Sequence, residues 1–541
     1  MAQFNYDGAD PRNRARFRFG SARYANARDF DRAGMFALDE TSLMFGFLGK
    51  RMVTYSGPGG AVIVAGARAG KLRDILAFSV CNTIHPGTML ILDLKGEEAA
   101  ISQDQTPDRK HCIYWNPRGL HGLPRHRLNP VGHLIMGSPT LYADIKQFVE
   151  NLIPLSGSAQ GEFFELRARE FLEGICLTLV KLKGVLTFPD LYHIINLIPG
   201  NSDEWIDFAY EMHVSGIPLA VRVEQEIAEG RNDSGGGFRG ILGELFKSVS
   251  ALSDPELMAS VSPPFNFDLA DFCRSDQRTN LYLMPPAETL EAWGPVVKAI
   301  FVGAMALKSR APSAPRQTWV IDEAAQLKKF PLLVSLYSLG AGLGIRPLCV
   351  FQSTHQMKTL GPDADNIIMA SAALRCFFGV RDIETATTIS RMSGSQTFDY
   401  VDPAQLMRAE HARRQTAHAM LSGSDPIAAA MQARQQMREA EQPRAQQRNL
   451  ITADEVMTLE GKAIIFADGL PGPGLVDRRA YYEQRFMAGR YHPNPYHPPA
   501  DVVRVKTLFG YNSKRVIREP VPTAYADYPQ YQDGFWSRIE D

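Results

Sequence analysis

The stretch Val62-Ile-Val-Ala-Gly-Ala-Arg-Ala-Gly-Lys71 decides the fold of this chain. It predicts a buried strand that runs into a tight turn of small residues and ends in Gly-Lys, ahead of a helix-like run over 72–80. The backbone N–H groups of such a turn and the N-terminus of the following helix face an anion, and the Lys reaches the outer phosphates of a nucleotide. The sequence therefore predicts a phosphate-binding loop, which consists of Gly66, Ala67, Arg68, Ala69, Gly70, Lys71 and Leu72.

This loop departs from the standard pattern G-x-x-x-x-G-K-[ST] at two positions. Ala65 stands where the first Gly is expected, and Ala can still make the turn. Leu72 stands where a Ser or Thr hydroxyl would ligate Mg²⁺, so water and other residues have to hold the ion. Taken alone, the segment is as compatible with an ordinary strand-to-helix turn as with a nucleotide loop.

A second strand, Gln317-Thr-Trp-Val-Ile-Asp322-Glu323, ends in two carboxylates. P-loop NTPases hold Mg²⁺ with an acidic residue at such a strand end, so Asp322 is the expected metal ligand. Glu323 is placed to polarise the attacking water. The alternative is that the pair caps a helix that starts at Ala324. The Gly-Lys loop in the same chain favours the NTPase, with ATP and Mg²⁺ as cofactors.

Bulk composition restricts the class of protein. The chain has 541 residues, with 45% hydrophobic and 22% charged residues, which is typical of a globular protein of two or three domains. The formal net charge is −1, so nucleic acid could bind only at a local basic patch. Six Cys without metal-ligand spacing indicate reduced thiols. No secretory signal or 18-residue apolar run is visible, so we expect a cytoplasmic chain that does not cross a membrane.

Short apolar strands alternate with longer amphipathic stretches, which predicts an α/β fold of the RecA-like, P-loop NTPase type: a central, mostly parallel sheet with an inserted all-α domain. A Gln/Arg-rich segment is expected as a solvated helix or a disordered insert, and a Pro/Tyr-rich end as an extended or unstructured tail. The expected organisation is an N-terminal arm and lead-in over 1–50, a nucleotide-binding domain over 51–183, an all-α insertion over 184–262, a second part of the nucleotide-binding domain over 263–400, the charged insert over 401–449, a last strand of the nucleotide-binding domain over 450–490 and the tail over 491–541.

The order of motifs resembles the coupling ATPases of type IV secretion systems, the TraG/TraD family of conjugation. The likeness spans about Phe19 to Phe486, and no single motif decides it. The segments that carry it are Gly20-Ser-Ala-Arg-Tyr-Ala, the loop Ala65–Lys71, Leu92-Asp-Leu-Lys-Gly-Glu97, Ile321-Asp-Glu323, Phe351-Gln-Ser353, Phe378-Gly-Val-Arg-Asp-Ile-Glu-Thr-Ala386 and Leu450-Ile-Thr-Ala-Asp-Glu-Val456. Most members also have a pair of N-terminal membrane helices, which this sequence does not show.

Further site residues follow from position and from the resemblance. Gln352 ends a neighbouring strand and is a candidate sensor of the γ-phosphate, or a polar strand cap. Asp93 and Lys95 end the strand beside the loop and either join the site or form an ion pair with Glu97. The resemblance implies a ring, commonly a hexamer, in which a neighbouring subunit supplies a cation. The candidates for this cation are Arg375 and Arg381.

The resemblance implies a coupling ATPase that recruits protein or nucleoprotein substrates, such as relaxase–DNA, and delivers them to the secretion channel. Adaptor proteins and other secretion components are the expected partners, and the chain would lie peripheral to the bacterial inner membrane through a partner. Two alternatives stay open. One is a soluble DNA translocase of the FtsK/HerA kind, and the other is an ATPase-deficient scaffold, which Leu72 favours. Whether the cargo is DNA, protein or both is open as well.

Overall fold

The computed structural model describes residues 19–39, 41–81, 87–103, 110–200, 202–231, 236–400, 403–421, 431, 434–435, 437–438 and 444–540. An eleven-stranded sheet in the order β2-β1-β13-β12-β9-β3-β8-β7-β4-β6-β5 lies at its centre. Its parallel part comprises β9 (Leu374–Phe378), β3 (Ala61–Ala65), β8 (Ile345–Phe351), β7 (Gln317–Ile321), β4 (Thr88–Leu92), β6 (Thr279–Leu283) and β5 (His111–Trp115).

An antiparallel extension continues the sheet beyond β9. It comprises β12 (Lys462–Ala467), β13 (Gly474–Asp477), β1 (Leu43–Leu48) and β2 (Arg51–Tyr55). The predicted mostly parallel α/β sheet is thereby confirmed. The sequence analysis did not identify β1, β2 and β13. Of these, only β2 lies at an edge of the sheet, and β1 (Leu43–Leu48) is an almost fully buried apolar run.

Side chains of the parallel strands alternate between two apolar layers. Val62 and Val64 of β3 join one cluster, whereas Ala61, Ile63 and Ala65 join the other. The strands are buried on both faces, as their unbroken apolar runs predict. One layer is covered by α12 (Leu290–Arg310), α13 (Pro331–Leu343), α14 (Ala364–Ser371), α15 (Ile383–Ser393) and α18 (Ala453–Met457). The other is covered by α2 (Ala27–Arg32), η2 (Leu72–Leu76), α3 (Ala77–Val80) and α4 (Glu97–Ile101).

Among the described residues, α12 is the one helix that is long and apolar enough to cross a bilayer. Two thirds of its most apolar window is buried inside the protein (67%), and Trp293 and Phe301 pack into the core beneath the sheet. Core helices commonly have this composition.

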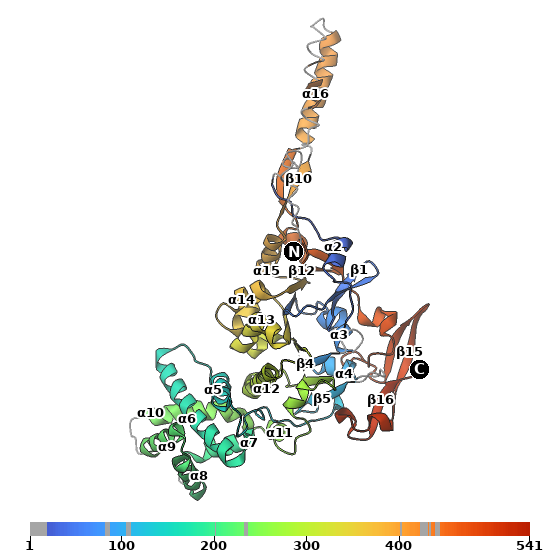
Figure 1. The fold of residues 1–541 in the computed structure, drawn as a ribbon. Helices are drawn as coiled ribbons and strands as arrows, with labels where there is room; N and C mark the ends of the chain where they lie inside the picture. The colour runs from blue at the N-terminus through green and yellow to red at the C-terminus, as the bar shows by residue number, and fades with distance from the viewer. Residues whose placement is uncertain are drawn as a thin grey trace.

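Helices without strands fill the chain between β5 and β6 and project from the sheet at the lower left of Figure 1. α6 packs against α9 and α10, while α5 packs against both α6 and α12. The helical unit therefore includes α6, ahead of residue 184 where the sequence placed its start, because packing rather than a helix end defines the unit. Its helices are α5 (Leu141–Leu152), α6 (Ala159–Lys183), α7 (Phe188–Leu197), α8 (Asp203–Val214), α9 (Pro218–Gly230), α10 (Gly237–Val249), η4 (Ser250–Ser253) and α11 (Pro255–Ser260).

Two smaller elements complete the fold (Figure 1). β10 (Ser395–Tyr400) pairs with β11 (Arg444–Asn449) and, with α16 (Pro403–Leu421), extends away from the body. The C-terminal region forms a three-stranded antiparallel sheet of β14 (Val502–Thr507), β15 (Gly510–Pro520) and β16 (Phe535–Ile539).

This C-terminal sheet differs from the extended or unstructured tail that the sequence suggested. Val503 and Val505 alternate with exposed or half-buried residues and are buried against the core, which is the pattern of a half-buried strand. The abundant Pro and Tyr residues obscured that pattern. The remaining short helices are η3 (Leu120–Gly122), η5 (Leu269–Cys273), η6 (Ala324–Leu327), η7 (Thr354–Leu360), η8 (Tyr481–Glu483), η9 (Arg485–Met487), η10 (Thr523–Tyr525) and η11 (Pro529–Tyr531).

Candidate nucleotide-binding site

The predicted site residues follow neighbouring parallel strands at one edge of the sheet. Ala65, the last residue of β3, pairs with Phe378 of β9, and Val64 pairs with Phe351 of β8. On the next strands, Ile321 of β7 pairs with Leu92 of β4. The loop after β3, Gln352 after β8, Asp322 after β7 and Asp93 after β4 therefore emerge in this order along one edge. β4 adjoins β7 and not β3, so the expectation that Asp93 and Lys95 end the strand next to the loop strand is wrong. The carboxyl edge of a parallel sheet is where α/β proteins place ligands.

The loop between β3 and η2 is a compact turn. Ala69 N–H donates a hydrogen bond to the Gly66 carbonyl at 3.2 Å, and Arg68 and Gly70 have φ of 59° and 89°. A Cβ on Gly66 would lie 2.3 Å from the carbonyl oxygen of Gly379, so only Gly fits there. Ala65 is the fully buried end of the strand, which explains why Gly is not needed at that position.

Arg478, which directly follows β13, holds the loop in place through two hydrogen bonds. Its Nη1 donates to the carbonyl oxygen of Ala69 at 2.6 Å and to Oδ2 of Asp74 at 2.7 Å. The Asp74 side chain is almost fully buried and also accepts a hydrogen bond from Arg73 Nε at 2.6 Å. Sequence analysis did not identify Arg478 or Asp74, because nothing in either local pattern distinguishes them from an ordinary surface arginine and helix aspartate.

Lys71 and Asp322 meet across the edge of the sheet. Lys71 Nζ lies 3.5 Å from Asp322 Oδ1, and neither atom has a hydrogen-bond partner although both are buried. A buried ammonium and a buried carboxylate oxygen that lack hydrogen bonds are costly, unless a ligand supplies them. A phosphate oxygen for Lys71 and a hydrated Mg²⁺ for Asp322 would supply the missing partners. The residues present therefore fit a magnesium–nucleotide complex.

Glu323 and Lys95 lie beside this pair. Lys95 Nζ is 3.8 Å from Glu323 Oε1, while Glu97 accepts a hydrogen bond from Asn494 Nδ2. The structure thus pairs Lys95 with Glu323 and not with Glu97. Glu323 has a left-handed backbone (φ 52°), which is uncommon for a residue other than Gly and often marks a functional position.

Two buried carboxylates adjoin Asp322. Asp93 accepts hydrogen bonds from the N–H groups of Glu97 (3.2 Å) and Ala99 (2.9 Å). Burial, with a further contribution from the charge of Asp322, raises the pKa of Asp93 to about 7. Glu98 is 2% exposed, and neither of its carboxylate oxygens has a hydrogen-bond partner. Its burial, together with the charge of Asp93, raises the pKa of Glu98 well above its usual value.

Glu98 is a site residue that sequence reasoning missed. It directly follows the motif Leu92–Glu97, but its burial beside Asp93 depends on how α4 packs against the sheet. Among the described residues, there is no group of three or more His, Cys, Asp or Glu side chains arranged to hold a metal ion by themselves. Mg²⁺ in NTPases is usually completed by phosphates and water, so one carboxylate can suffice.

The remaining candidates occupy different places. Gln352 lies between the strand of the loop and the strand of Asp322, and its N–H donates to Gln356 Oε1 at 2.8 Å. Arg381 Cδ would lie 3.7 Å from a Cβ on Gly66, so Arg381 adjoins the loop of its own chain. Arg375 is opposite Val62 near the start of β9, away from the carboxyl edge. Its Nε is buried without a hydrogen-bond partner.

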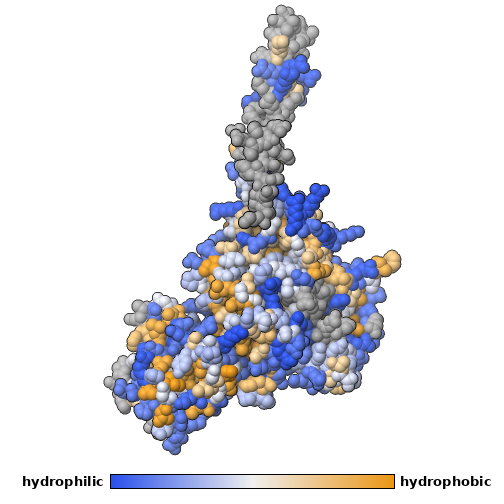
Figure 2. Space-filling view, viewed as in Figure 1, coloured by the Kyte–Doolittle hydropathy of each residue, from blue (hydrophilic) through white to orange (hydrophobic). Residues whose placement is uncertain are grey.

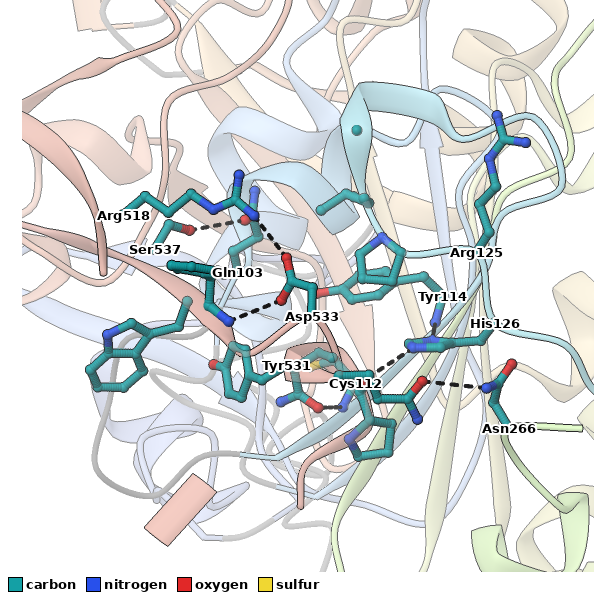
Figure 3. Close-up of a pocket in the computed structure, with 18 residues that line it drawn as sticks. Gln103, Cys112, Tyr114, Arg125, His126, Asn266, Arg518, Tyr531, Asp533 and Ser537 are labelled. Carbon is teal, nitrogen blue, oxygen red and sulfur yellow. Dashed lines mark hydrogen bonds and ion pairs between the residues drawn. The ribbon is translucent and has the colours of Figure 1, made fainter. Parts of the chain in front are cut away.

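A separate pocket of about 600 Å³ lies where the C-terminal sheet meets the edge strand β5 (Figure 3). His126 accepts a hydrogen bond from Tyr114 N–H through Nδ1 and lies 3.0 Å from the Pro529 carbonyl through Nε2. Gln530 accepts from Cys112 N–H and donates to the Lys110 carbonyl. None of the predicted nucleotide-site residues lines this pocket, which is the junction between two parts of the fold.

A parallel sheet with a Gly-Lys loop on one strand and an acidic pair at the end of another defines a P-loop NTPase. Residues 47–500 match the family model described as type IV secretory system conjugative DNA transfer. The match covers most of the chain, and the protein belongs to this family. The predicted family and fold class are both confirmed.

Solved structures of the bacterial conjugative coupling protein TrwB have the same fold. The unbound form of TrwBdeltaN70 has a TM-score of 0.58 and 14% identity, with 85% of this chain and 92% of that chain covered. The complex with ADP and Mg²⁺ has a TM-score of 0.56, 14% identity and coverage of 85% and 94%. The complex with the non-hydrolysable ATP analogue ADPNP has a TM-score of 0.57, 14% identity and coverage of 85% and 93%. No curated protein sequence matches this chain.

Proposed function

We propose that this protein is a coupling ATPase, which binds ATP between Lys71 and Asp322 and uses binding and hydrolysis to pass substrates to a type IV secretion channel. One observation carries the proposal: Lys71 Nζ and Asp322 Oδ1 are buried together without hydrogen-bond partners, at the edge where the loop ends. The TrwB complexes with ADP and Mg²⁺ and with ADPNP support a nucleotide as the missing ligand.

The residues around this pair have distinct roles in the proposal. Lys71 donates to the β- and γ-phosphates, and the N–H groups of residues 66–72 surround them. Mg²⁺, when bound by Asp322, would neutralise charge on the same phosphates. Glu323 accepts a proton from the attacking water, and Gln352 lies where it can contact the γ-phosphate. Lys95 holds the Glu323 carboxylate near this position through their 3.8 Å ion pair.

Leu72 supports a second candidate function. Leu72 is the first residue of η2, packs half-buried against the apolar layer there, and has no hydroxyl for Mg²⁺. A chain that binds nucleotide weakly or without turnover could serve as a scaffold that assembles secretion adaptors. The coupling ATPase is preferred because a scaffold gives no reason to keep Lys71 Nζ and Asp322 Oδ1 buried as an ion pair that makes no hydrogen bond.

Partners and location extend the proposal. The helical unit α5–α11 projects away from the sheet (Figure 1) and is our candidate for contact with protein or relaxase–DNA cargo and with adaptors. We propose a cytoplasmic homo-hexamer, peripheral to the inner membrane and held there by secretion-system partners. Within it, Arg375 of one subunit would serve the phosphates of its neighbour, because Arg375 lies away from the loop of its own chain.

Nucleotide binding and hydrolysis by the purified chain test the proposal. Lys71→Ala should abolish binding of a fluorescent ATP analogue, whereas Glu323→Gln should bind but lose turnover. Lys247→Ala, an exposed lysine on α10, is the matched control and should behave like wild type. Nucleotide binding without turnover in the wild type would indicate the scaffold. Hydrolysis that depends on DNA alone, with no secretion partner, would indicate the soluble translocase.

A further inference from the structure

The tip of the β14–β15 hairpin exposes two large apolar side chains. Thr507 pairs with Gly510, so Leu508 and Phe509 form the two-residue loop, and they are 69% and 97% exposed. Gly510 alone adopts positive φ (105°) in this turn, so the backbone does not require any particular side chain at the two loop positions. Turns usually carry Gly, Asn, Asp or Ser there. An exposed Leu-Phe pair therefore has no structural reason within the chain.

Figure 2 shows this tip as a hydrophobic projection at the right of the molecule. Phe509 is the most exposed of the large apolar residues described. Scattered apolar residues on a surface are ordinary, but two adjacent ones at the end of a projecting hairpin can insert as a unit. A narrow projecting tip is better suited to insertion into an apolar layer than to packing on a flat protein surface.

The hairpin is basic. Residues 502–520 contain five Lys or Arg residues and one acid, Glu519 at the end far from the tip, in a chain whose formal net charge is −1. Arg504 and Lys506 lie over the ring of Tyr511, at 4.2 and 4.3 Å from its centroid. These contacts hold the two cations along the hairpin, behind the apolar tip. The other three are Lys514, Arg515 and Arg518, of which Arg518 pairs with Asp533.

A groove of about 760 Å³ continues this surface onto the β1–β2 turn. Lys506 belongs to both the hairpin and the groove. Exposed apolar residues are present there too, as Leu38 is 56% and Phe486 39% exposed. The charged residues of the lining are Lys50, Arg51, Arg479, Glu483, Arg485 and Lys506, so cations outnumber the single acid.

Two of these groove cations already have carboxylate partners outside the groove. Arg51 pairs with Asp31 at 2.9 Å and Arg479 with Asp477 at 3.6 Å. Both pairs are more than one-third exposed on each side, and exposed pairs are worth little in water. They can therefore exchange a carboxylate for a phosphate at small cost.

We propose that the docking surface, defined as Leu508, Phe509, Lys506, Lys50 and Arg485, binds an anionic lipid bilayer. Leu508 and Phe509 insert at the boundary of headgroups and acyl chains, and the cations bind lipid phosphates. An apolar tip backed by basic residues is the combination that gives reversible membrane binding. Nucleic acid would use the cations and stack on Phe509, but it would gain little from an aliphatic leucine at the tip. The observations therefore favour lipid.

This surface goes beyond the proposed function, because lipid binding needs neither the nucleotide nor the loop. It would give the protein a direct contact with the membrane beside any contact through secretion partners. The contact would be peripheral, because the tip side chains enter only the boundary of headgroups and acyl chains.

Vesicle flotation with the 541-residue chain tests the inference. Vesicles of phosphatidylcholine with about 30% phosphatidylglycerol should bind the wild type at about 0.05 M NaCl, and binding should fall at about 0.5 M because salt screens the phosphates. The double variant Leu508→Ser/Phe509→Ser should weaken binding about tenfold or more. Lys50→Glu/Arg485→Glu should weaken binding to anionic vesicles by a similar factor.

Matched control variants distinguish binding through this surface from non-specific binding to vesicles. Leu339→Ser removes a 62%-exposed leucine on α13, and Lys247→Glu reverses a 72%-exposed lysine on α10; both should bind vesicles like wild type. Lys71→Ala should also bind vesicles like wild type. Loss of nucleotide binding and loss of lipid binding can then be told apart. The inference is overturned if the tip variant floats as well as wild type, or if neutral and anionic vesicles bind equally. Loss of binding to single-stranded DNA with unchanged flotation would also overturn it.

Discussion

At the scale of single residues, the nucleotide pocket concentrates buried polar atoms that make no hydrogen bond within the chain. Lys71 Nζ, Asp322 Oδ1 and both carboxylate oxygens of Glu98 are buried without hydrogen-bond partners. A protein that folds with such groups gives up stability for a function at that place. The effect of substituting each residue depends on whether its side chain is charged and on the neighbours that hold it.

Asp93 and Glu98 make the stability of the nucleotide-free protein depend on pH. The folded-state pKa of Asp93 is about 7, against an ordinary value of 3.8, so folding favours the protonated form. That contribution to stability is present below about pH 4 and is lost as the pH rises through 7. Glu98 is shifted in the same direction. We expect the melting temperature of the nucleotide-free protein to fall from pH 5 to pH 8 for this reason.

Glu98→Gln should reduce that fall, because the amide has the same shape and does not ionise. Relative to wild type, the variant should melt higher at pH 8 and nearly equally at pH 5. Glu410→Gln, an exposed residue on α16, serves as the control. Thermal denaturation at the two pH values is the measurement. A variant that melts lower at pH 8 would contradict an uncompensated charge at Glu98.

Arg478 is expected to hold the loop in its binding conformation. Arg478→Ala removes the donor to the Ala69 carbonyl and leaves Asp74 with Arg73 alone. Because Asp74 keeps its pair with Arg73, the loss should be smaller than the roughly 3–5 kcal/mol that an uncompensated buried charge costs. Denaturant unfolding should show this loss, and titration with a fluorescent nucleotide should show weaker affinity. The adjacent Arg479→Ala should cost much less, as its side chain is 37% exposed.

At the scale of elements, the edge of the sheet is closed by the C-terminal unit. Among the described strands, β5 pairs with β6 alone, and the side chain of Gln530 hydrogen-bonds to the Cys112 N–H and the Lys110 carbonyl at its other edge. His111 and Tyr528 stack beside it at 4.2 Å. Edge strands with unpaired backbone groups attract other chains, and a covering segment prevents this.

Gln530→Ala should therefore destabilise the protein by about 1–3 kcal/mol, because a buried backbone N–H loses its acceptor. Size-exclusion chromatography after mild heating should also show more aggregate than in wild type. Gln532→Ala, whose side chain hydrogen-bonds only at an exposed position, is the neighbouring control. Unchanged stability and solubility in Gln530→Ala would mean that the edge is protected in another way.

At the scale of the whole molecule, the two arginine candidates lie in different relations to the pocket. Arg381 adjoins the loop of its own chain, whereas Arg375 lies near the start of β9. A ring of subunits would let Arg375 act on a neighbouring site, where a cation would stabilise charge in the transition state. Substituting Arg381 should therefore affect nucleotide binding by a monomer, whereas substituting Arg375 should affect turnover by an oligomer.

Arg381→Ala should weaken nucleotide binding at protein concentrations too low for assembly. Arg375→Ala should leave that binding unchanged and lower turnover at high concentration, by about 10³-fold if it serves as a trans-acting arginine. Mass photometry gives the oligomeric state in parallel, and Arg375→Lys tests whether charge alone suffices. If Arg375→Ala lowers binding by the monomer as well, the residue acts within its own chain or through folding.

The sequence by itself determined the strands of the parallel sheet, the Gly-Lys loop and the acidic pair. Each of these is specified by neighbours along the chain: an apolar run makes a buried strand, and small residues before Lys make the turn. The family and fold class could be predicted for the same reason. The sequence also shows that Ala65 and Leu72 depart from the standard G-x-x-x-x-G-K-[ST] pattern. Only the structure, which places Ala65 at the end of β3, explains why Ala is tolerated there.

Only the tertiary structure decided which distant residues meet. The contact of Arg478 with the loop, the burial of Glu98 beside Asp93, the closing of β5 by Gln530 and the position of Arg375 all depend on strand order and helix packing. The same holds for the start of the helical unit at α5 and for the C-terminal sheet. Burial and pairing between segments hundreds of residues apart are set by how the layers pack, and no local pattern records them.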